Sequence, residues 1–190
     1  KKPIDILHME TVAKHIPSAR FIHIVRDGRD QTLSILKRDW GPANLYTGLR
    51  FWSRLVTNGR HDGQNLKGRY LEIRYEDLLL HPEDTIPIIV NYIFGQKSSE
   101  LSSKVVNWVH STRKLTTVFG WENTMSNREA YMCEAAAGET LRSFDYQTRF
   151  DNDAKVSRLV ARYYQILDIL NRVKNVARRV SSGGRFRRGL

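Results

Sequence analysis

A short strand that runs directly into a charged, glycine-containing turn is the feature that most limits how this chain can fold. Phe21–Val25 is a mostly apolar run, which is typical of a buried central strand. The turn Arg26–Asp30 follows, and helical spacing then resumes with Leu33 and Leu36 on one face. A strand, a turn and a helix in this order form the repeating unit of parallel sheets, in which ligands bind beyond the carboxyl ends of the strands.

The rest of the chain extends this unit into an alternation of helices and strands. In chain order, the expected elements are a helix over 4–15, a strand over 21–25, a helix through Leu33 and Leu36, a helix over 45–59, a strand over 70–75, a helix after Pro82, a helix opened by the capping box Ser126–Glu129 and a long helix over 156–180. This order predicts an α/β fold, namely a three-layer sandwich with a central parallel sheet.

Two helix boundaries are predicted from single residues. Gly59 is a good helix terminator and is expected to end the third helix. Pro82 suits the first helical position, but Pro87 would cost about 3 kcal/mol inside a helix. We therefore expect the helix in this region to begin nearer Ile86.

The positive charge is concentrated toward the carboxyl terminus. The net charge of the 190 residues is +11, and Arg172–Leu190 contains seven Lys/Arg and no Asp/Glu. We expect a domain over 1–150, a long amphipathic helix over 151–180 and a basic flexible tail over 181–190. The helix should pack on the body of the protein or pair with a second chain, and the tail is either solvated or in contact with anionic partners.

Several classes of protein are disfavoured by what the sequence lacks. A single cysteine, Cys133, excludes an internal disulfide and a multi-cysteine zinc site, and the six histidines show no metal-binding spacing. No apolar run reaches the roughly 18 residues that a membrane span needs. The first residues have no apolar leader-like segment, so we expect a cytoplasmic location, although the natural start of the protein can lie upstream of Lys1.

Arg26 and Ser34 are the residues of the turn that best suit an anionic ligand. The guanidinium of Arg26, at the end of a strand, can bind a phosphate through two parallel hydrogen bonds. Ser34, about one turn into the following helix, can add a hydroxyl donor near the positive end of that helix. The alternative is a solvated turn in which Arg26 and Arg29 pair with Asp27 and Asp30.

This region resembles a known family. Phe21–Asp30, followed by Ser34, is similar to the 3′-phosphate-binding motif of sulfotransferases that use 3′-phosphoadenosine-5′-phosphosulfate (PAPS). The resemblance implies that Arg26 and Ser34 hold the 3′-phosphate of this donor, which acts as co-substrate without a metal. It also implies a fold like that of the P-loop NTPases.

Further segments resemble the same family in the same order, over about Lys1 to Gln147. Arg69–Leu78 resembles the segment after the 3′-phosphate motif, and the tyrosine that matches Tyr75 meets the adenine ring in related enzymes. Gly120-Trp121 and Cys133–Tyr146 resemble the closing helix of the family. Ordered motifs of this kind make coincidence improbable.

The resemblance also points to parts of the site that differ or are missing. Lys1 matches the lysine that neutralises charge on the transferring group or the leaving oxygen, so it is the candidate catalytic residue. Asp5, His8 and Glu10 are the nearby candidates for a general base. No segment resembles the Pro-Lys-Ser-Gly-Thr loop that wraps the 5′-phosphosulfate, so we expect a chain truncated before Lys1, without the first strand and that loop.

One departure concerns the residue before Trp121. Relatives often carry an arginine there as a second 3′-phosphate contact, whereas this chain has Gly120. Arg113 and Lys114 could replace it, or they could belong to a solvated basic loop.

The sequence therefore predicts a sulfotransferase that transfers a sulfuryl group from PAPS to a hydroxyl or amine acceptor. The alternative is a non-catalytic or decayed sulfotransferase-like module whose basic tail binds anionic partners. A small kinase is disfavoured because no Gly-x-x-x-x-Gly-Lys-Ser/Thr loop occurs in the chain.

Overall fold

The computed structural model describes residues 3–38, 41–95, 99–113, 115, 118–150 and 154–181. The elements in chain order are η1 (Pro3–His8), α1 (Met9–His15), β1 (Phe21–Val25), α2 (Gly28–Leu36), α3 (Leu45–Gln64), β2 (Tyr70–Arg74), α4 (Tyr75–Leu80), α5 (Pro82–Phe94), α6 (Ser99–Thr112), α7 (Trp121–Thr124), α8 (Asn127–Ser143) and α9 (Arg158–Ser181). Two compact units divide the chain: Lys1–Asp30 with Trp52–Thr124, and Gln31–Phe51 with Met125–Leu190. The domain boundaries expected at 150 and 180 stay predictions, and residues 182–190 of the tail lie outside the described part.

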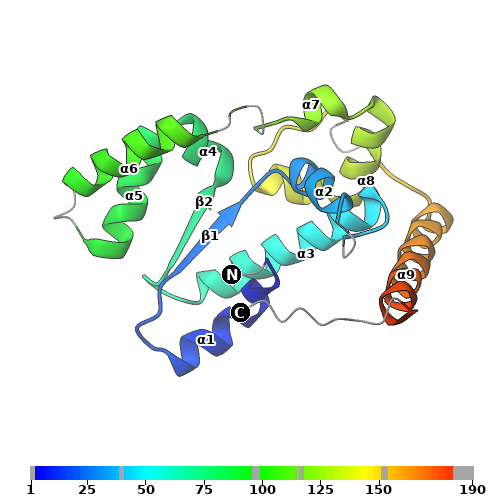
Figure 1. Ribbon diagram of the computed structural model, residues 1–190, viewed down its shortest axis with the longest axis horizontal. Helices are drawn as coiled ribbons and strands as arrows, with labels where there is room; N and C mark the ends of the chain where they lie inside the picture. The colour runs from blue at the N-terminus through cyan, green and yellow to red at the C-terminus, as the bar shows by residue number, and fades with distance from the viewer. Residues whose placement is uncertain are drawn as a thin grey trace. The chain divides into compact units, whose positions relative to one another are not determined.

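The two strands of the first unit pair in parallel, as the sequence predicts. Phe21 lies opposite Tyr70 and Val25 opposite Arg74, so the whole of β1 is matched by β2 (Figure 1). Within the described residues this sheet has two strands, and the protein is a largely helical α/β structure. The strand ends are in register, so the residues that follow them, Arg26 and Tyr75, emerge at the same edge.

Helix α3 does not end at Gly59, so that prediction was wrong. The helix continues through Gly59 and Gly63 to Gln64. A side chain at Gly59 would overlap Ile6, and one at Gly63 would overlap the ring of Tyr70. The two glycines, one helical turn apart, therefore let the helix approach the sheet closely, and close packing rather than termination explains them.

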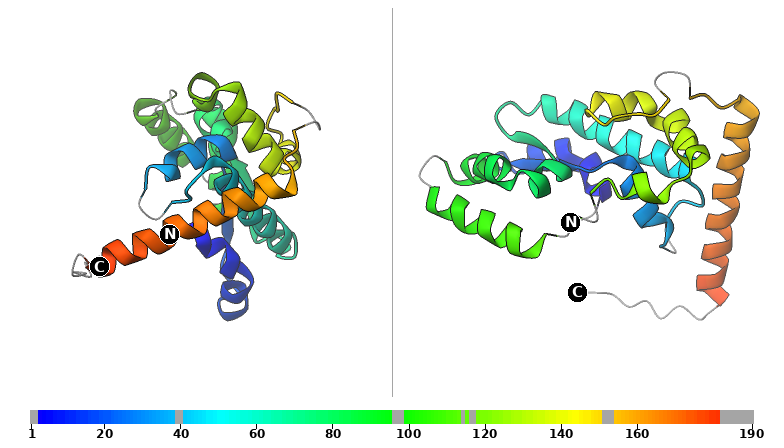
Figure 2. Two further views of the ribbon diagram at one scale, coloured as in Figure 1. Left: turned by 90° about the vertical axis from the view of Figure 1, so that its right-hand side faces the viewer. Right: turned by 90° about the horizontal axis from the view of Figure 1, so that it is seen from above.

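Helix α5 begins at Pro82 and contains Pro87, so the expected start near Ile86 was also wrong. Pro82 occupies the start of the helix, where a missing N–H costs nothing. Ile86 and Val90 are buried with Val109 of α6. Helices α5 and α6 lie side by side (Figure 2). This packing offsets the backbone cost of an internal proline.

The second unit contains the capping box that the sequence predicts. Ser126 accepts a hydrogen bond from the backbone N–H of Glu129, and the Glu129 carboxylate accepts one from the backbone N–H of Ser126. The helix that follows, α8, buries Cys133 and Leu141. Helix α9 is amphipathic, as the spacing of its apolar residues predicts. Among the described residues, no helix combines the length and the apolar character needed to cross a bilayer.

The glycine at position 63 gives the first testable prediction. Alanine is the better helix former by about 1 kcal/mol, but overpacking against the Tyr70 ring typically costs about 1–3 kcal/mol. Gly63→Ala should therefore lower the free energy of unfolding, measured by urea titration. Asn58→Ala, at an exposed position of the same helix, is the control and should leave stability unchanged or raised. A stabilised Gly63→Ala variant would contradict the close packing described for α3.

Candidate functional site

The candidate site begins where the chain leaves β1. Arg26 follows the strand, and its backbone carbonyl accepts a hydrogen bond of 3.0 Å from the indole N–H of Trp52. The guanidinium carbon of Arg26 lies 5.1 Å from the centre of the Tyr75 ring, a cation–π distance. The side chain of Arg26 is 26% exposed, so solvent and ligands can reach it.

The next residues form a buried ion pair. Arg29 donates from Nε to Oδ1 of Asp27 at 3.0 Å and from Nη2 to Oδ2 at 2.7 Å, the two-point geometry that suits a guanidinium and a carboxylate. The two side chains are 1% and 0% exposed. The guanidinium carbon of Arg29 also lies 3.6 Å from the ring centre of Trp121, so an aromatic face covers the buried cation.

Two hydrogen bonds fix this turn to distant segments. The backbone N–H of Asp27 donates to the buried carboxylate of Glu76 at 2.9 Å, which ties the turn to α4. The backbone N–H of Trp121 donates to Oδ1 of Asp30 at 2.8 Å, which ties it to α7. The segment that presents Arg26 is therefore held by residues about 50 and 90 positions further along the chain.

Asp30 is a buried carboxyl group close to Arg26. Burial raises the pKa of Asp30 above its ordinary value, although the Trp121 hydrogen bond and the positive charge of Arg26 act in the opposite direction. Oδ2 of Asp30 lies 3.8 Å from Nη2 of Arg26, beyond hydrogen-bonding distance. Oδ2 makes no hydrogen bond within the described residues.

The two arginines of the turn therefore differ in what they can do. The pairs of the solvated-turn alternative are both present, but the Asp27–Arg29 pair is buried rather than solvated. Arg29 is enclosed and acts in folding, whereas Arg26 is partly exposed, beside an aromatic ring. Arg26 can bind an anionic group such as a phosphate without dismantling the buried pair.

The predicted site residues fall into three groups. Arg26 and Tyr75 are in contact. Ser34 is exposed on α2, and because that helix begins at Gly28, Ser34 lies nearly two turns from its start rather than one. The helix dipole acts mainly within the first turn and so contributes little there. Lys1 lies outside the described residues, and the ligand roles of all four residues stay predictions.

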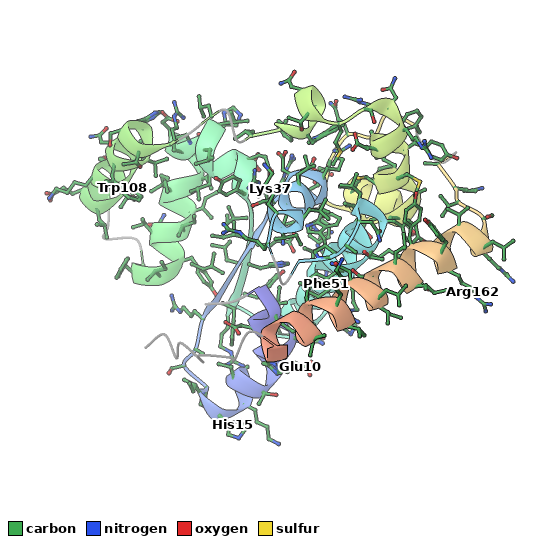
Figure 3. The ribbon with its side chains drawn as sticks, turned by 45° about the vertical axis from the view of Figure 1, so that its right-hand side comes forward. Glu10, His15, Lys37, Phe51, Trp108 and Arg162 are labelled. Carbon is green, nitrogen blue, oxygen red and sulfur yellow. The ribbon has the colours of Figure 1, made fainter. Side chains whose placement is uncertain are left out.

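The secondary candidates are only partly placed. The Arg113 side chain donates to the backbone carbonyl of Leu79 at 2.6 Å, so it has a structural contact. Lys114 lies outside the described residues. Asp5, His8 and Glu10 are exposed near the start of the chain, with Glu10 on α1 (Figure 3). Nothing in these positions selects one of them as a base.

The sequence named Arg29 only as part of a solvated turn and Trp121 only through the family resemblance, and it gave no sign that Glu76 belongs to the site. The spacing of charges in the turn does not show which arginine is buried, and Glu76 and Trp121 come from separate helices. No local pattern could have joined them to the turn.

A second polar cluster lies between the sheet and α3. The hydroxyl of Tyr70 donates to Oε2 of Glu72 at 2.8 Å, and Nδ1 of His23 lies 2.7 Å from that hydroxyl. Arg60 donates to both oxygens of Glu72, with its shortest contact at 2.6 Å. Within the described residues, no three His, Cys, Asp or Glu side chains are placed to hold a metal ion.

The cluster shifts two pKa values in opposite directions. Burial favours the neutral form of Glu72, but hydrogen bonds from His23, Arg60 and Tyr70 outweigh it and lower the pKa of Glu72 from 4.5 to about 2. Burial and the adjacent Glu72 carboxylate raise the pKa of Tyr70. The cluster therefore widens the pH range over which Glu72 stays ionised and Tyr70 stays neutral.

Comparisons with known proteins support the resemblance to sulfotransferases. Residues 1–94 match the model of the sulfotransferase family. A protein of Caenorhabditis briggsae named, provisionally, as a protein-tyrosine sulfotransferase is 26% identical over 106 residues, which are 53% of this chain and 38% of that protein. Protein-tyrosine sulfotransferase 1 of Danio rerio is 28% identical over 98 residues, which are 49% of this chain and 28% of that protein. The matches thus span well under half of these relatives, and no solved structure gives a significant match.

The buried ion pair gives a prediction about stability. Removing one partner leaves an uncompensated buried charge, so Asp27→Ala should lower the free energy of unfolding by about 3–5 kcal/mol. The double variant Asp27→Ala/Arg29→Ala should lose less than the sum of the two single variants in chemical unfolding. Glu100→Ala, which breaks an exposed pair with Lys104, is the control and should change little. Additive losses at Asp27 and Arg29 would contradict the pairing.

The lowered pKa of Glu72 predicts a pH-dependent effect. A carboxyl group with a lowered pKa stabilises the fold above about pH 4.5, and this contribution fades as the pH falls toward 2. Glu72→Gln should therefore cost up to about 3 kcal/mol in urea unfolding at pH 7, since each pKa unit corresponds to about 1.4 kcal/mol, and progressively less below pH 4.5. Glu100→Gln, at an exposed position, is the control. A cost that stays constant between pH 7 and pH 2.5 would rule out the ionic role of Glu72.

Proposed function

We propose, from the premise that this chain belongs to the sulfotransferase family, that it carries the 3′-phosphate part of a PAPS-binding site. In this proposal Arg26 and Ser34 bind the 3′-phosphate, and Tyr75 contacts the adenine ring. All three residues lie within the 1–94 segment that matches the family. The three-layer, P-loop-like arrangement expected from the resemblance is part of the same proposal.

The observation that carries the proposal is the partly exposed Arg26 guanidinium beside the Tyr75 ring at the carboxyl edge of two parallel strands. A nucleotide with a ribose-borne phosphate needs a cation for that phosphate and an apolar or aromatic surface for its base. Arg26 and Tyr75 offer both within one contact distance. The buried Asp27–Arg29 pair makes the support rigid, which lowers the ordering cost of binding.

The chemistry explains why cations dominate such a site. Sulfuryl transfer resembles phosphoryl transfer, in which the protein contributes alignment and stabilisation of negative charge rather than covalent steps. Arg26 would orient the donor through a phosphate remote from the reacting sulfur. Lys1 is proposed to stabilise charge near the reacting centre, and a general base near the acceptor would complete the set.

The acceptor class is proposed from the two relatives. Both are named as protein-tyrosine sulfotransferases, so the phenolic hydroxyl of a tyrosine in a polypeptide is the first acceptor to test among hydroxyls and amines. The matches cover only 38% and 28% of those proteins. Sulfuryl transfer is therefore proposed for the whole protein, and donor binding is proposed for this chain.

The alternative function is a non-catalytic module of the same family. It is favoured by the basic sequence Arg172–Leu190, which contains seven Lys/Arg and no Asp/Glu. Such a module would bind anionic partners with strong salt dependence and would not need Arg26.

Adenosine 3′,5′-bisphosphate, the product left by the donor, gives a direct test of the site. A ligand at a hundredfold its dissociation constant stabilises the folded state by about 2.7 kcal/mol, so the bisphosphate should raise the melting temperature of the chain. Arg26→Ala should abolish that rise, because it removes the proposed phosphate contact. The readout is the difference between melting temperatures with and without ligand, so a change in basal stability does not obscure it.

Lys67→Ala is the matched control for charge. Lys67 is exposed and precedes β2, whereas Arg26 lies at the carboxyl edge of the two parallel strands. Lys67→Ala should therefore leave the ligand-induced rise in melting temperature unchanged. An equal rise in Arg26→Ala would remove Arg26 from the site. A larger rise with ATP than with the bisphosphate would instead favour a kinase-like nucleotide site.

A further inference from the structure

Helix α9 presents an apolar stripe to solvent along most of its length. Five of its members follow one another at steps of four and three residues, and each is more than half exposed: Leu159 at 80%, Tyr163 at 59%, Ile166 at 55%, Leu170 at 59% and Val173 at 61%. Ile169 and Val176 widen the stripe on one side, each at 60%. A contiguous exposed patch of this kind marks an interaction site rather than ordinary surface.

The opposite face of α9 is the one that packs on its own unit. The ring of Tyr164 stacks on Tyr46 with the ring centres 5.8 Å apart. The carboxylate of Asp168 accepts a hydrogen bond of 2.7 Å from the backbone N–H of Ala43, and the Asn44 side chain donates to the carbonyl of Tyr164 at 3.0 Å. These contacts fix the rotation of the helix about its axis, so the apolar stripe faces away from the loop that it packs on.

The charges of α9 are almost all positive. Asp168 is the only acidic residue in Arg158–Ser181; it is 6% exposed and pairs with Arg172 at 2.8 Å. Arg158, Arg162 and Lys174 are exposed, and Figure 3 marks Arg162 on this helix. The solvent-facing side of α9 therefore combines apolar side chains with cations, and no carboxylate of the helix faces solvent there.

Three cations lie along the borders of the stripe, and Arg162 lies within its widened side, between Val173 and Ile169. At 3.6 residues per turn, Lys174 falls beside Tyr163 on one border, and Arg158 and Arg172 fall beyond Ile169 on the other. The segment Arg178–Leu190, which begins in the last turn of α9, adds further positive charge, because it contains five arginines and no acidic residue.

We propose that α9 is a membrane-surface helix whose occupant is a bilayer rich in anionic lipids. Such a surface offers apolar depth along a line and phosphate groups on both sides of it, which matches an apolar stripe bordered by cations. The long stems of Lys and Arg let their charges reach the headgroups while the stripe is buried. The helix would lie in the interface, in keeping with the finding that no described helix can span a bilayer.

Charge disfavours a second copy of the chain as the occupant. Paired helices are held in register by opposite charges beside the apolar seam. In α9 the exposed border charges are all cations, so two copies would place like charges against each other. This inference does not depend on the donor site, since it uses no residue of the Arg26 region.

Sedimentation with lipid vesicles tests the proposal on the full chain. Vesicles of phosphatidylcholine with one quarter phosphatidylserine should bind the protein at least tenfold more tightly than vesicles of phosphatidylcholine alone. Raising the salt to 0.5 M should remove most of that difference, because the Debye length then falls well below 10 Å. Equal binding to both vesicles, or no binding to either, would overturn the proposal.

Two variants separate the apolar and the basic contributions. Ile166→Ser/Leu170→Ser removes the centre of the stripe, and Arg158→Ser/Arg162→Ser/Lys174→Ser removes three exposed cations of α9. Each variant should reduce binding to anionic vesicles at least tenfold. Both sets are exposed, so circular dichroism and melting temperature should stay unchanged. Ile93→Ser/Phe94→Ser, on the exposed part of α5, is the apolar control and should bind like the unmodified chain.

The oligomeric state distinguishes a membrane from a second copy of the chain as the occupant of the stripe. Sedimentation velocity should show the same species for the unmodified chain and for Ile166→Ser/Leu170→Ser. The opposite result has two parts: the unmodified chain is a dimer that does not bind anionic vesicles, and the variant is a monomer. That result would overturn the proposal and assign the stripe to a second copy.

Discussion

Two opposite charges buried side by side hold the carboxyl end of β1 in place. Asp27 and Arg29 are almost completely enclosed, and burying either alone would cost several kcal/mol. The cost is offset because the guanidinium meets both carboxylate oxygens and lies against the Trp121 ring. With Glu76 holding the backbone of Asp27, the turn becomes a rigid support. Arg26 owes its accessible position to this support.

The same turn shows how far the sequence alone could lead. The strand, the turn and the parallel pairing were predictable, because an apolar run and period-two alternation depend on nearby residues. The contact of Arg26 with Tyr75 was not predicted, because it depends on the register of the two strands. The burial of Arg29 did not follow, since it depends on Trp121, which lies far along the chain. A guanidinium in a turn looks the same in sequence whether its partner is solvent or an indole.

Local rules failed where packing between elements decided the outcome. Gly59 is a residue type that often ends a helix, yet α3 continues through it, and the absent side chain leaves the space that Ile6 occupies. Pro87 has a local cost inside α5, yet the burial of Ile86 and Val90 against α6 outweighs it. In both places a backbone preference of about 1–3 kcal/mol competes with the burial of large side chains, which contributes about as much for each residue. Which of the two effects is larger depends on the residue that packs against the position, and this residue is distant in the sequence.

Helix α9 reverses the usual division of an amphipathic helix. Its period predicted an apolar stripe, but not that hydrogen bonds and a tyrosine stack would attach the other face to the unit. A helix that packed its stripe inward would stabilise the fold by about 1.5–3 kcal/mol for each large apolar side chain that it buried. In α9 that free energy stays available to a second surface. The exposed cations of α9 and the arginines that follow it attract negative charge. The helix is therefore suited to lie on an anionic surface.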